Sequence, residues 1–334
     1  ESDKEYVIEH YINRFPEDIL SKLAVEPVLR TYLLSLINSR IIHSKETIMD
    51  FFSSTFWAHQ YKDILRMEKI IDRMLKLLMD WGFLQEVQNG FRATAIGKRV
   101  AELYVDPLTA NQMIIALGKA SEKTLRSMSF LQLVCNTLEM RPLLRVKQKE
   151  FDDVQGKYAI LEPNLLEHEP SMFEPEYEDF LNSIKTALML EDWIDEKDEE
   201  WILEHYDCRP GEVRVKIDNA DWLLYACHEL ATLMQYQLIL KEITKVRLRL
   251  RYGVKEELLP LIRLEGVGRV RARKLFSAGL RDLGELRNAP MERLQECVGA
   301  AIAKSIKLQV GQKVQGTLLD EPAQSSGSEK LGEL

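Results

Sequence analysis

The sequence predicts a mainly α-helical protein with more than one domain. Apolar residues recur at the three- and four-residue spacing of amphipathic helices, and only 16 glycines and 11 prolines interrupt 334 residues. That length suggests two or three domains, and a hydrophobic content of 46% is enough for their cores. Because the chain opens at Glu1 rather than Met, we expect a piece of a longer protein. We find no signal-peptide pattern and no apolar run of about 18 residues, so we expect no membrane contact.

Residues 1–105 predict a lead-in segment and a domain of three helices and a hairpin. The helices are expected at 18–40 with an interruption near Pro27, at 44–52 with Ser44 as the N-cap, and at 63–81. The third helix has an apolar stripe formed by Ile64, Met67, Ile71, Met74, Leu75 and Leu78.

A β-hairpin is expected at 83–94. Asn89-Gly90 is the strongest signal for its turn, because both turn positions need positive φ. Three helices followed by a small hairpin is the winged-helix arrangement. Such domains bind DNA or pack against protein about equally often, so the pattern assigns neither Asn89 nor Arg92 to DNA.

Residues 106–255 predict a helical bundle. A helix is expected at 177–191, and the signal Cys208-Arg-Pro-Gly-Glu212 starts a long helix that runs to about Leu240. On this long helix one apolar stripe, about 80° wide, is formed by Ile217, Ala220, Leu224, Cys227 and Ala231.

Trp222 lies roughly 170° from the centre of that stripe, and Arg214 lies two turns before it. An outward indole with an arginine nearby suits base stacking and phosphate contact on a single strand. Packing of Trp222 against a neighbouring domain is the alternative, and Asp218 and Glu229 on the same side argue against a purely electrostatic groove.

Residues 256–318 predict a small helix-hairpin-helix domain that binds DNA. Its turn and the cations that follow are Gly266, Gly268, Arg269, Arg271, Arg273 and Lys274. Glycines let the backbone turn with outward N–H groups, and N–H groups at a helix start favour phosphate. The alternative is a glycine cap followed by a solvated basic helix. Residues 319–334 are rich in Ser, Gly and Glu, and we expect them to be disordered.

The distribution of charge supports a local nucleic-acid site despite a net charge of −8. Residues 149–204 hold 18 acidic and 4 basic residues, whereas residues 241–316 hold 17 basic and 8 acidic residues. Because a ligand experiences the local field, the basic part can bind phosphates while the acidic part faces away.

No motif predicts catalysis or a metal site. The four cysteines contain no CxxC pair and predict buried thiols, and the six histidines lack metal-ligand spacing. Neither Gly97-Lys98 nor Gly118-Lys119 belongs to a P-loop, and no hydrolase signature occurs. We therefore expect no ATPase activity from this chain alone.

The chain as a whole resembles the C-terminal half of the archaeal Hjm helicases, relatives of the HELQ helicase in the Ski-like branch of superfamily two. Over residues 15–316 the matching stretches are Phe15–Leu23, Ala93–Gly97, Leu103–Pro107, Lys185–Ile194, Ala220–Leu224, Tyr252–Leu259 and Gly266–Leu275. They occur in the order of the family.

The resemblance implies a winged helix, a helical "ratchet" domain and a helix-hairpin-helix domain. It also implies two RecA-like motor domains elsewhere in the parent protein, which bind ATP and magnesium and move 3′ to 5′ along DNA. In the family a ratchet tryptophan, matching Trp222, stacks a base. An earlier arginine assists it, and either Arg214 or the position of Val215 matches that arginine. The run matching Arg269, Arg271 and Arg273 holds the emerging 3′ tail.

The implied partners are single-stranded and forked DNA, the motor domains, and replication or repair proteins, in a cytoplasmic, nucleoid-associated setting. Two other functions stay open at this point. One is a protein-interaction scaffold without a motor, and the other is the related cassette of an RNA helicase.

Overall fold

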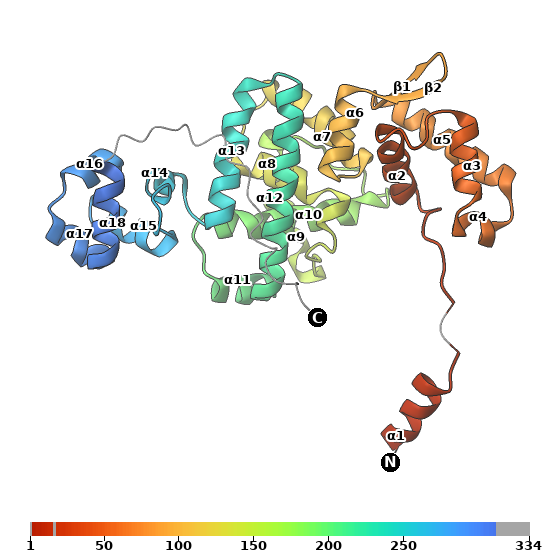
Figure 1. The fold of residues 1–334 in the computed structure, drawn as a ribbon. Coiled ribbons are helices and arrows are strands. Elements are labelled where there is room, and N and C mark those ends of the chain that lie inside the picture. Colours follow the sequence, from red (N-terminus) through yellow and green to blue (C-terminus); the bar gives the residue numbers. More distant parts are fainter. Residues whose placement is uncertain (1, 16–17, 312–334) are drawn as a thin grey trace, which may run out of the picture. The chain divides into compact units, whose positions relative to one another are not determined.

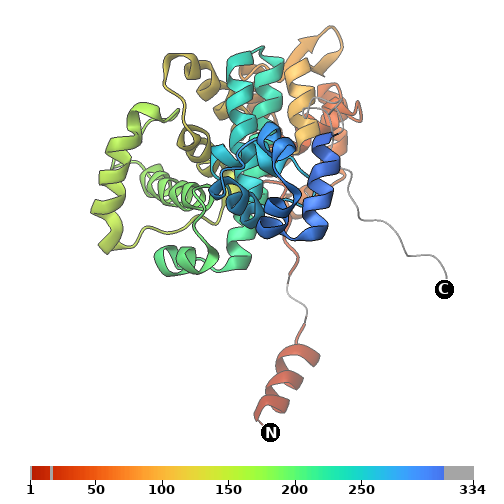
Figure 2. The same ribbon diagram turned by 90° about the vertical axis from the view of Figure 1, so that its left-hand side faces the viewer.

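The computed structural model describes residues 2–15 and 18–311 (Figures 1 and 2). The chain divides into two compact units, Glu1–Arg251 and Tyr252–Leu334, which are described separately. The structure confirms a mainly α-helical fold, because the only strands in the described part are β1 (Leu84–Val87) and β2 (Gly90–Ala93). The predicted tail at 319–334 lies outside the described residues.

The first unit opens with α1 (Ser2–Val7) and a π-helical turn, η1 (Ile8–Ile12). The predicted helix at 18–40 is shorter than expected, because α2 spans Glu26–Asn38 and residues 18–25 are not helical. Pro27 explains the difference. It lies in the first turn of α2, the position where a missing N–H costs nothing, and so it starts the helix instead of interrupting it.

The winged-helix part follows the predicted order, with two helices that the sequence analysis did not predict. Its helices are α3 (Lys45–Ser53), α4 (Phe56–Tyr61), α5 (Ile64–Asp80) and α6 (Ala95–Leu103), of which α4 and α6 were not predicted. Ser44 caps α3 as expected, since its side chain accepts from the backbone N–H of Thr47. The predicted stripe of α5 is buried except for Ile64, which is 58% exposed at the first helical position.

The hairpin turn lies one residue earlier than predicted. Val87 pairs with Gly90, so the two-residue loop is Gln88-Asn89, and Asn89 does not have positive φ. Gly90 is needed for another reason. Its φ is +128°, and a Cβ atom there would lie 2.0 Å from the carbonyl oxygen of His43, which accepts from the N–H of Phe91.

The rest of the first unit is a helical bundle. Its helices are α7 (Pro107–Lys119), α8 (Ser127–Cys135), α9 (Phe151–Leu161), α10 (Glu176–Ile194), α11 (Glu199–Tyr206), α12 (Pro210–Leu233) and α13 (Gln237–Tyr252). Short 3-10 turns connect them: η2 (Ala120–Glu122), η3 (Leu138–Met140), η4 (Gln148–Glu150) and η5 (Glu162–Asn164). Thus α12 ends before Leu240, since Gln235 takes a left-handed conformation with φ of +61° and separates α12 from α13.

One apolar core runs through the winged-helix part and the bundle. The predicted stripe of α12 is buried, and Leu223, Ala226 and Leu230 bury a second side of this helix. Cys135, Cys208 and Cys227 are buried free thiols, as expected, whereas Cys297 is only partly buried, and burial raises the pKa of Cys227 to about 12. The boundary expected at residues 105/106 stays a prediction.

The second unit has its own apolar core. Its elements are η6 (Glu256–Leu258), α14 (Leu259–Ile262), α15 (Arg269–Ser277), α16 (Leu283–Asn288), α17 (Met291–Val298) and α18 (Ala300–Gly311).

Candidate nucleic-acid interface

The predicted hairpin lies between α14 and α15, and its two glycines have different roles. Gly266 has φ of +80°, a conformation that L side chains rarely adopt, and a Cβ atom there would lie 3.3 Å from Ile302. Gly268 is extended, with φ of −89°, and is the N-cap of α15. A Cβ atom on Gly268 would meet nothing within 4 Å, so the start of α15 is open to a ligand.

The cations of α15 lie around the helix, not along one face. At about 100° per residue, Arg269 and Arg273 share one side, while Arg271 and Lys274 share another. The guanidinium of Arg271 turns back to the hairpin, where Nη1 donates to the carbonyl of Gly266 over 2.9 Å.

Arg273 is held on the other side of α15. Its Nη1 lies 2.8 Å from Oε1 of Glu257, and its guanidinium lies 5.3 Å from the centroid of the Phe276 ring. The hairpin therefore presents Arg271 and Lys274 as exposed cations, whereas Arg273 is partly buried and paired with a carboxylate.

A second hairpin joins α17 to α18, and the sequence analysis missed it. Gly299 turns the chain with φ of +85°, and its carbonyl accepts the N–H of Ala303 in the first turn of α18. A glycine between two apolar helical segments was the available signal. No cluster of cations follows it, and Lys307 donates to the carbonyls of Arg287 and Ala289 within the unit.

The outer face of α12 holds the other predicted residues. Trp222 is partly buried against the core, and its Nε1–H donates to the carbonyl of Leu103 at the end of α6 over 3.1 Å. Trp222 therefore packs against the core on one side and stays partly exposed, so its position is compatible with both packing and base stacking. Arg214 is exposed two turns earlier, with Nε 3.2 Å from Oδ2 of Asp218. Val215 is also exposed (58%), so exposure does not separate the two candidate positions.

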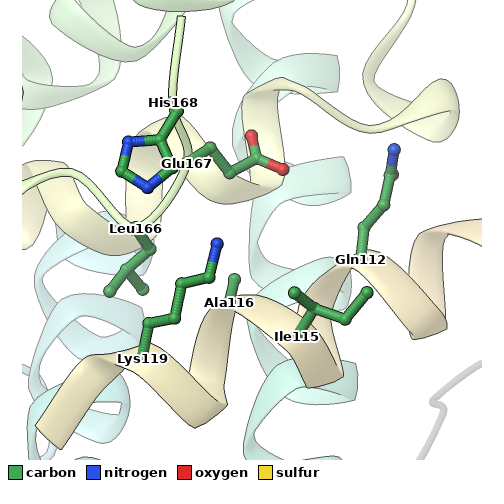
Figure 3. Close-up of a pocket in the computed structure, with 7 residues that line it drawn as sticks. All are labelled: Gln112, Ile115, Ala116, Lys119, Leu166, Glu167 and His168. Carbon is green, nitrogen blue, oxygen red and sulfur yellow. The ribbon is translucent and has the colours of Figure 1, made fainter.

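A small cavity of about 220 Å³ lies between α7 and residues 166–168. Figure 3 shows Gln112, Ile115 and Lys119 of α7 facing Glu167 and His168. Burial raises the pKa of Glu167. Its Oε2 accepts from Asn136 (2.7 Å) and Gln132 (3.3 Å), whose own buried Oε1 has no partner.

We expect Glu167→Gln to increase the free energy of unfolding at neutral pH by about 1 kcal/mol, the size of one net hydrogen bond. A neutral amide avoids the cost of burying a charge and can donate to Oε1 of Gln132. Because the folded pKa of Glu167 is raised, the wild type loses stability as pH rises through the window above its ordinary value of 4.5. Urea unfolding of both proteins from pH 4 to 8 should show the difference growing with pH, and a constant difference would contradict this account.

Two protein families match consecutive parts of the chain. "Archaeal helicase, domain 4" matches residues 128–253, and "SAM-like Helix-hairpin-helix tandem" matches residues 258–311. The second match covers both hairpins described above. ATP-dependent DNA helicase Hel308 of Methanocaldococcus jannaschii is 36% identical over 93% of this chain and 25% of its own length. The chain is homologous to part of the Hel308 helicases.

Two further Hel308 proteins support this relationship. That of Pyrococcus horikoshii is 35% identical over 92% of the chain and 43% of its own length, and that of Thermococcus kodakarensis is 33% identical over 98% and 29%. The chain thus spans less than half the length of these Hel308 relatives. The expected relationship to archaeal DNA helicases is confirmed. Among the residues that the structure describes, no helix has both the length and the apolar character needed to cross a bilayer.

Proposed function

We propose that this chain is the DNA-binding portion of an ATP-dependent 3′–5′ DNA helicase that acts in the repair and recombination of replication forks. Homology of nearly the whole chain to DNA helicases carries the proposal, and it favours DNA over RNA as the ligand. RecA-like motor domains of the parent protein would bind ATP and magnesium. Single-stranded and forked DNA, and replication or repair proteins, would be its partners in the nucleoid.

Two groups of residues would contact the strand. On α12 the indole of Trp222 would stack a base, which contributes roughly 1–3 kcal/mol without reading sequence, and Arg214 would contact a phosphate. In the second unit the hairpin of Gly266 and Gly268 would approach the backbone, and the cations Arg269, Arg271, Arg273 and Lys274 would neutralise its charge. Neither group reads base edges, which suits an enzyme that moves along arbitrary DNA.

We expect Trp222→Ala to weaken binding of a labelled single strand about tenfold, or about 1.4 kcal/mol, which lies within the range for one stacked base. Trp222→Phe should weaken binding less than Trp222→Ala, since it keeps an aromatic ring for stacking while it loses the second ring of the indole and the bond to Leu103. Fluorescence anisotropy over a salt series, with single-stranded, 3′-tailed and blunt duplex DNA, measures both effects.

Trp201→Ala is the matched control for the loss of an indole. Trp201 lies on α11, where it stacks on His205 with ring centroids 3.7 Å apart. Equal binding by Trp222→Ala and Trp201→Ala would make Trp222 a packing residue and leave DNA contact to the hairpin. No DNA affinity in the wild type, together with capture of a protein partner, would instead support an interaction scaffold.

A further inference from the structure

The face of α12 that carries Trp222 also carries three carboxylates, and arginines hold all of them. Asp218 pairs with Arg214 of the same helix. Asp221 holds two arginines of α13, with Oδ1 3.0 Å from Nε of Arg247 and Oδ2 3.0 Å from Nη2 of Arg251. Glu229 holds an arginine of the winged helix, since its Oε2 lies 2.6 Å from Nη2 of Arg99.

Because of these ion pairs, the carboxylates of this face no longer argue against the binding of a DNA strand there. Each carboxylate is paired with an arginine, and Arg99 also pairs with Glu102 of its own helix, so four arginines offset four acids and the face is not a net acidic one. The arginines come from three helices, α6, α12 and α13, and α12 and α13 lie side by side (Figures 1 and 2).

Tyr225 lies at the centre of this group. It follows Trp222 by three residues, so both rings lie on the same side of α12. Its side chain is exposed (37%), and Cζ of Arg247 lies 5.0 Å from its ring centroid. Its hydroxyl lies 3.2 Å from Nη2 of Arg99. Thus one arginine lies over the ring of Tyr225 and another donates to its hydroxyl, and each of these arginines is also paired with at least one carboxylate.

We propose that Tyr225, Arg99 and Arg247 form a second contact site for a single DNA strand beside Trp222. Asp221 and Glu229 hold the two arginines in the unbound protein, and phosphate oxygens replace these carboxylates when the strand binds. The inference rests on the proposed function, because it places the strand on α12.

The chemistry of the residues supports this exchange. The guanidinium presents its planar fork equally well to a carboxylate or to a phosphate, so one partner can substitute for the other. When phosphate takes the place of the carboxylate, each guanidinium stays paired with an anion, so no arginine is left uncompensated. The side chains of Asp221 and Arg247 are 22% and 23% exposed, and those of Glu229 and Arg99 are 25% and 29% exposed, which leaves access from one side. An aromatic ring beside arginines offers a stacking surface together with phosphate contacts, a combination that binds bases of any sequence.

The test measures affinity of the full chain for fluorescently labelled oligothymidine. We expect Arg247→Gln to weaken binding about fivefold. The slope of log affinity against log salt should also become shallower by about 0.7, the value for one lost phosphate contact on a single strand. Tyr225→Ala should weaken binding about fivefold with little change in slope, and Tyr225→Phe should weaken it less.

Asp221→Asn distinguishes phosphate exchange from a structural role. It removes the acid that competes with phosphate, so we expect affinity to rise about threefold, whereas loss of a purely structural contact would lower it. Glu204→Gln on α11 is the control for removal of a negative charge elsewhere, and it should change affinity less than Asp221→Asn.

Arg145→Gln is the matched control for Arg247→Gln. The side chain of Arg145 is 82% exposed and its Nε lies 3.5 Å from Oε1 of Glu178. Arg145 lies three residues after Pro142, whose carbonyl accepts from Lys216 on the other side of α12, so this arginine is away from the face of Trp222.

Equal affinities of Arg247→Gln and Arg145→Gln for the strand, together with weakened binding by Trp222→Ala, would overturn the second site and leave the proposed function intact. Absence of single-strand binding by the wild type would overturn both. Reduced affinity of Asp221→Asn at an unchanged melting temperature would overturn the exchange of carboxylate for phosphate.

Discussion

Arg30→Met is expected to lower the free energy of unfolding by about 3–5 kcal/mol, the cost of leaving one partner of a buried ion pair uncompensated. Arg30 of α2 contacts Asp106 through two hydrogen bonds, Nε to Oδ1 over 2.5 Å and Nη2 to Oδ2 over 2.7 Å. Both side chains are almost fully buried. Asp106 also caps α7, where its side chain accepts from the N–H of Leu108, so a disturbance there reaches the first turn of the bundle.

Two further variants make this prediction specific. Arg30→Met combined with Asp106→Asn should lose less stability than Arg30→Met alone, because asparagine carries no charge and can still cap α7. Arg73→Met removes an arginine from the exposed ion pair with Glu26, and it should cost no more than about 1 kcal/mol. Urea unfolding with an unchanged slope in denaturant measures all three. Similar losses for Arg30→Met and Arg73→Met would show that the buried pair has no special role.

Gly90→Ala should destabilise the protein by about 3 kcal/mol or more. This sums about 1–3 kcal/mol of backbone strain and about 1–3 kcal/mol of overpacking. The backbone at Gly90 has φ of +128°, and the new methyl group would lie 2.0 Å from a backbone oxygen that cannot rotate away. The strand β2 and the segment that leads into α3 would have to separate.

Gly156→Ala tests whether any added methyl group has this effect. Gly156 lies inside α9, and a Cβ atom there meets nothing within 4 Å. Alanine should therefore raise stability by about 0.5–1 kcal/mol, because it favours the helix over the unfolded chain. Thermal unfolding followed by circular dichroism compares the two variants. Destabilisation by both, or by neither, would mean that the approach of His43 to Gly90 is unimportant.

Gly90 also shows where prediction from the sequence reaches its limit. The pair Asn89-Gly90 predicted a hairpin, and a hairpin is present. The glycine is required, however, because the carbonyl oxygen of His43, 47 residues earlier, leaves no room for a Cβ atom. Local turn preferences cannot show a contact between distant segments. The start of α2 could have been predicted, because Pro27 restricts the local backbone whatever surrounds it.

The same distinction applies to α12. Its period predicted the buried stripe around Ile217 and Leu224 because each residue's angle on a helix is fixed. Burial of Leu223 and Leu230 depends on which elements pack on the other side, and so does the bond from Trp222 to Leu103, 119 residues away. The pairing of Asp221 and Glu229 with arginines likewise needed the folded structure.

In the second unit the cations following Gly268 made the first hairpin recognisable. The second hairpin, at Gly299, has a similar turn but is not followed by a run of cations, and Lys307 donates to carbonyls within the unit. The contributions of Gly266, Gly268 and the α15 cations to binding stay predictions, as do those of Arg214 and Trp222.

The hydrogen bond from Trp222 to Leu103 has a consequence for conformational entropy. A fully exposed tryptophan samples several rotamers, and a ligand that stacks on it must select one of them. Here the indole N–H is already bonded and part of the ring packs against the core, so the side chain is ordered before anything binds. A base that stacks on this ring would lose little affinity to side-chain ordering. Each base of a moving strand would meet the ring in the same orientation as the base before it.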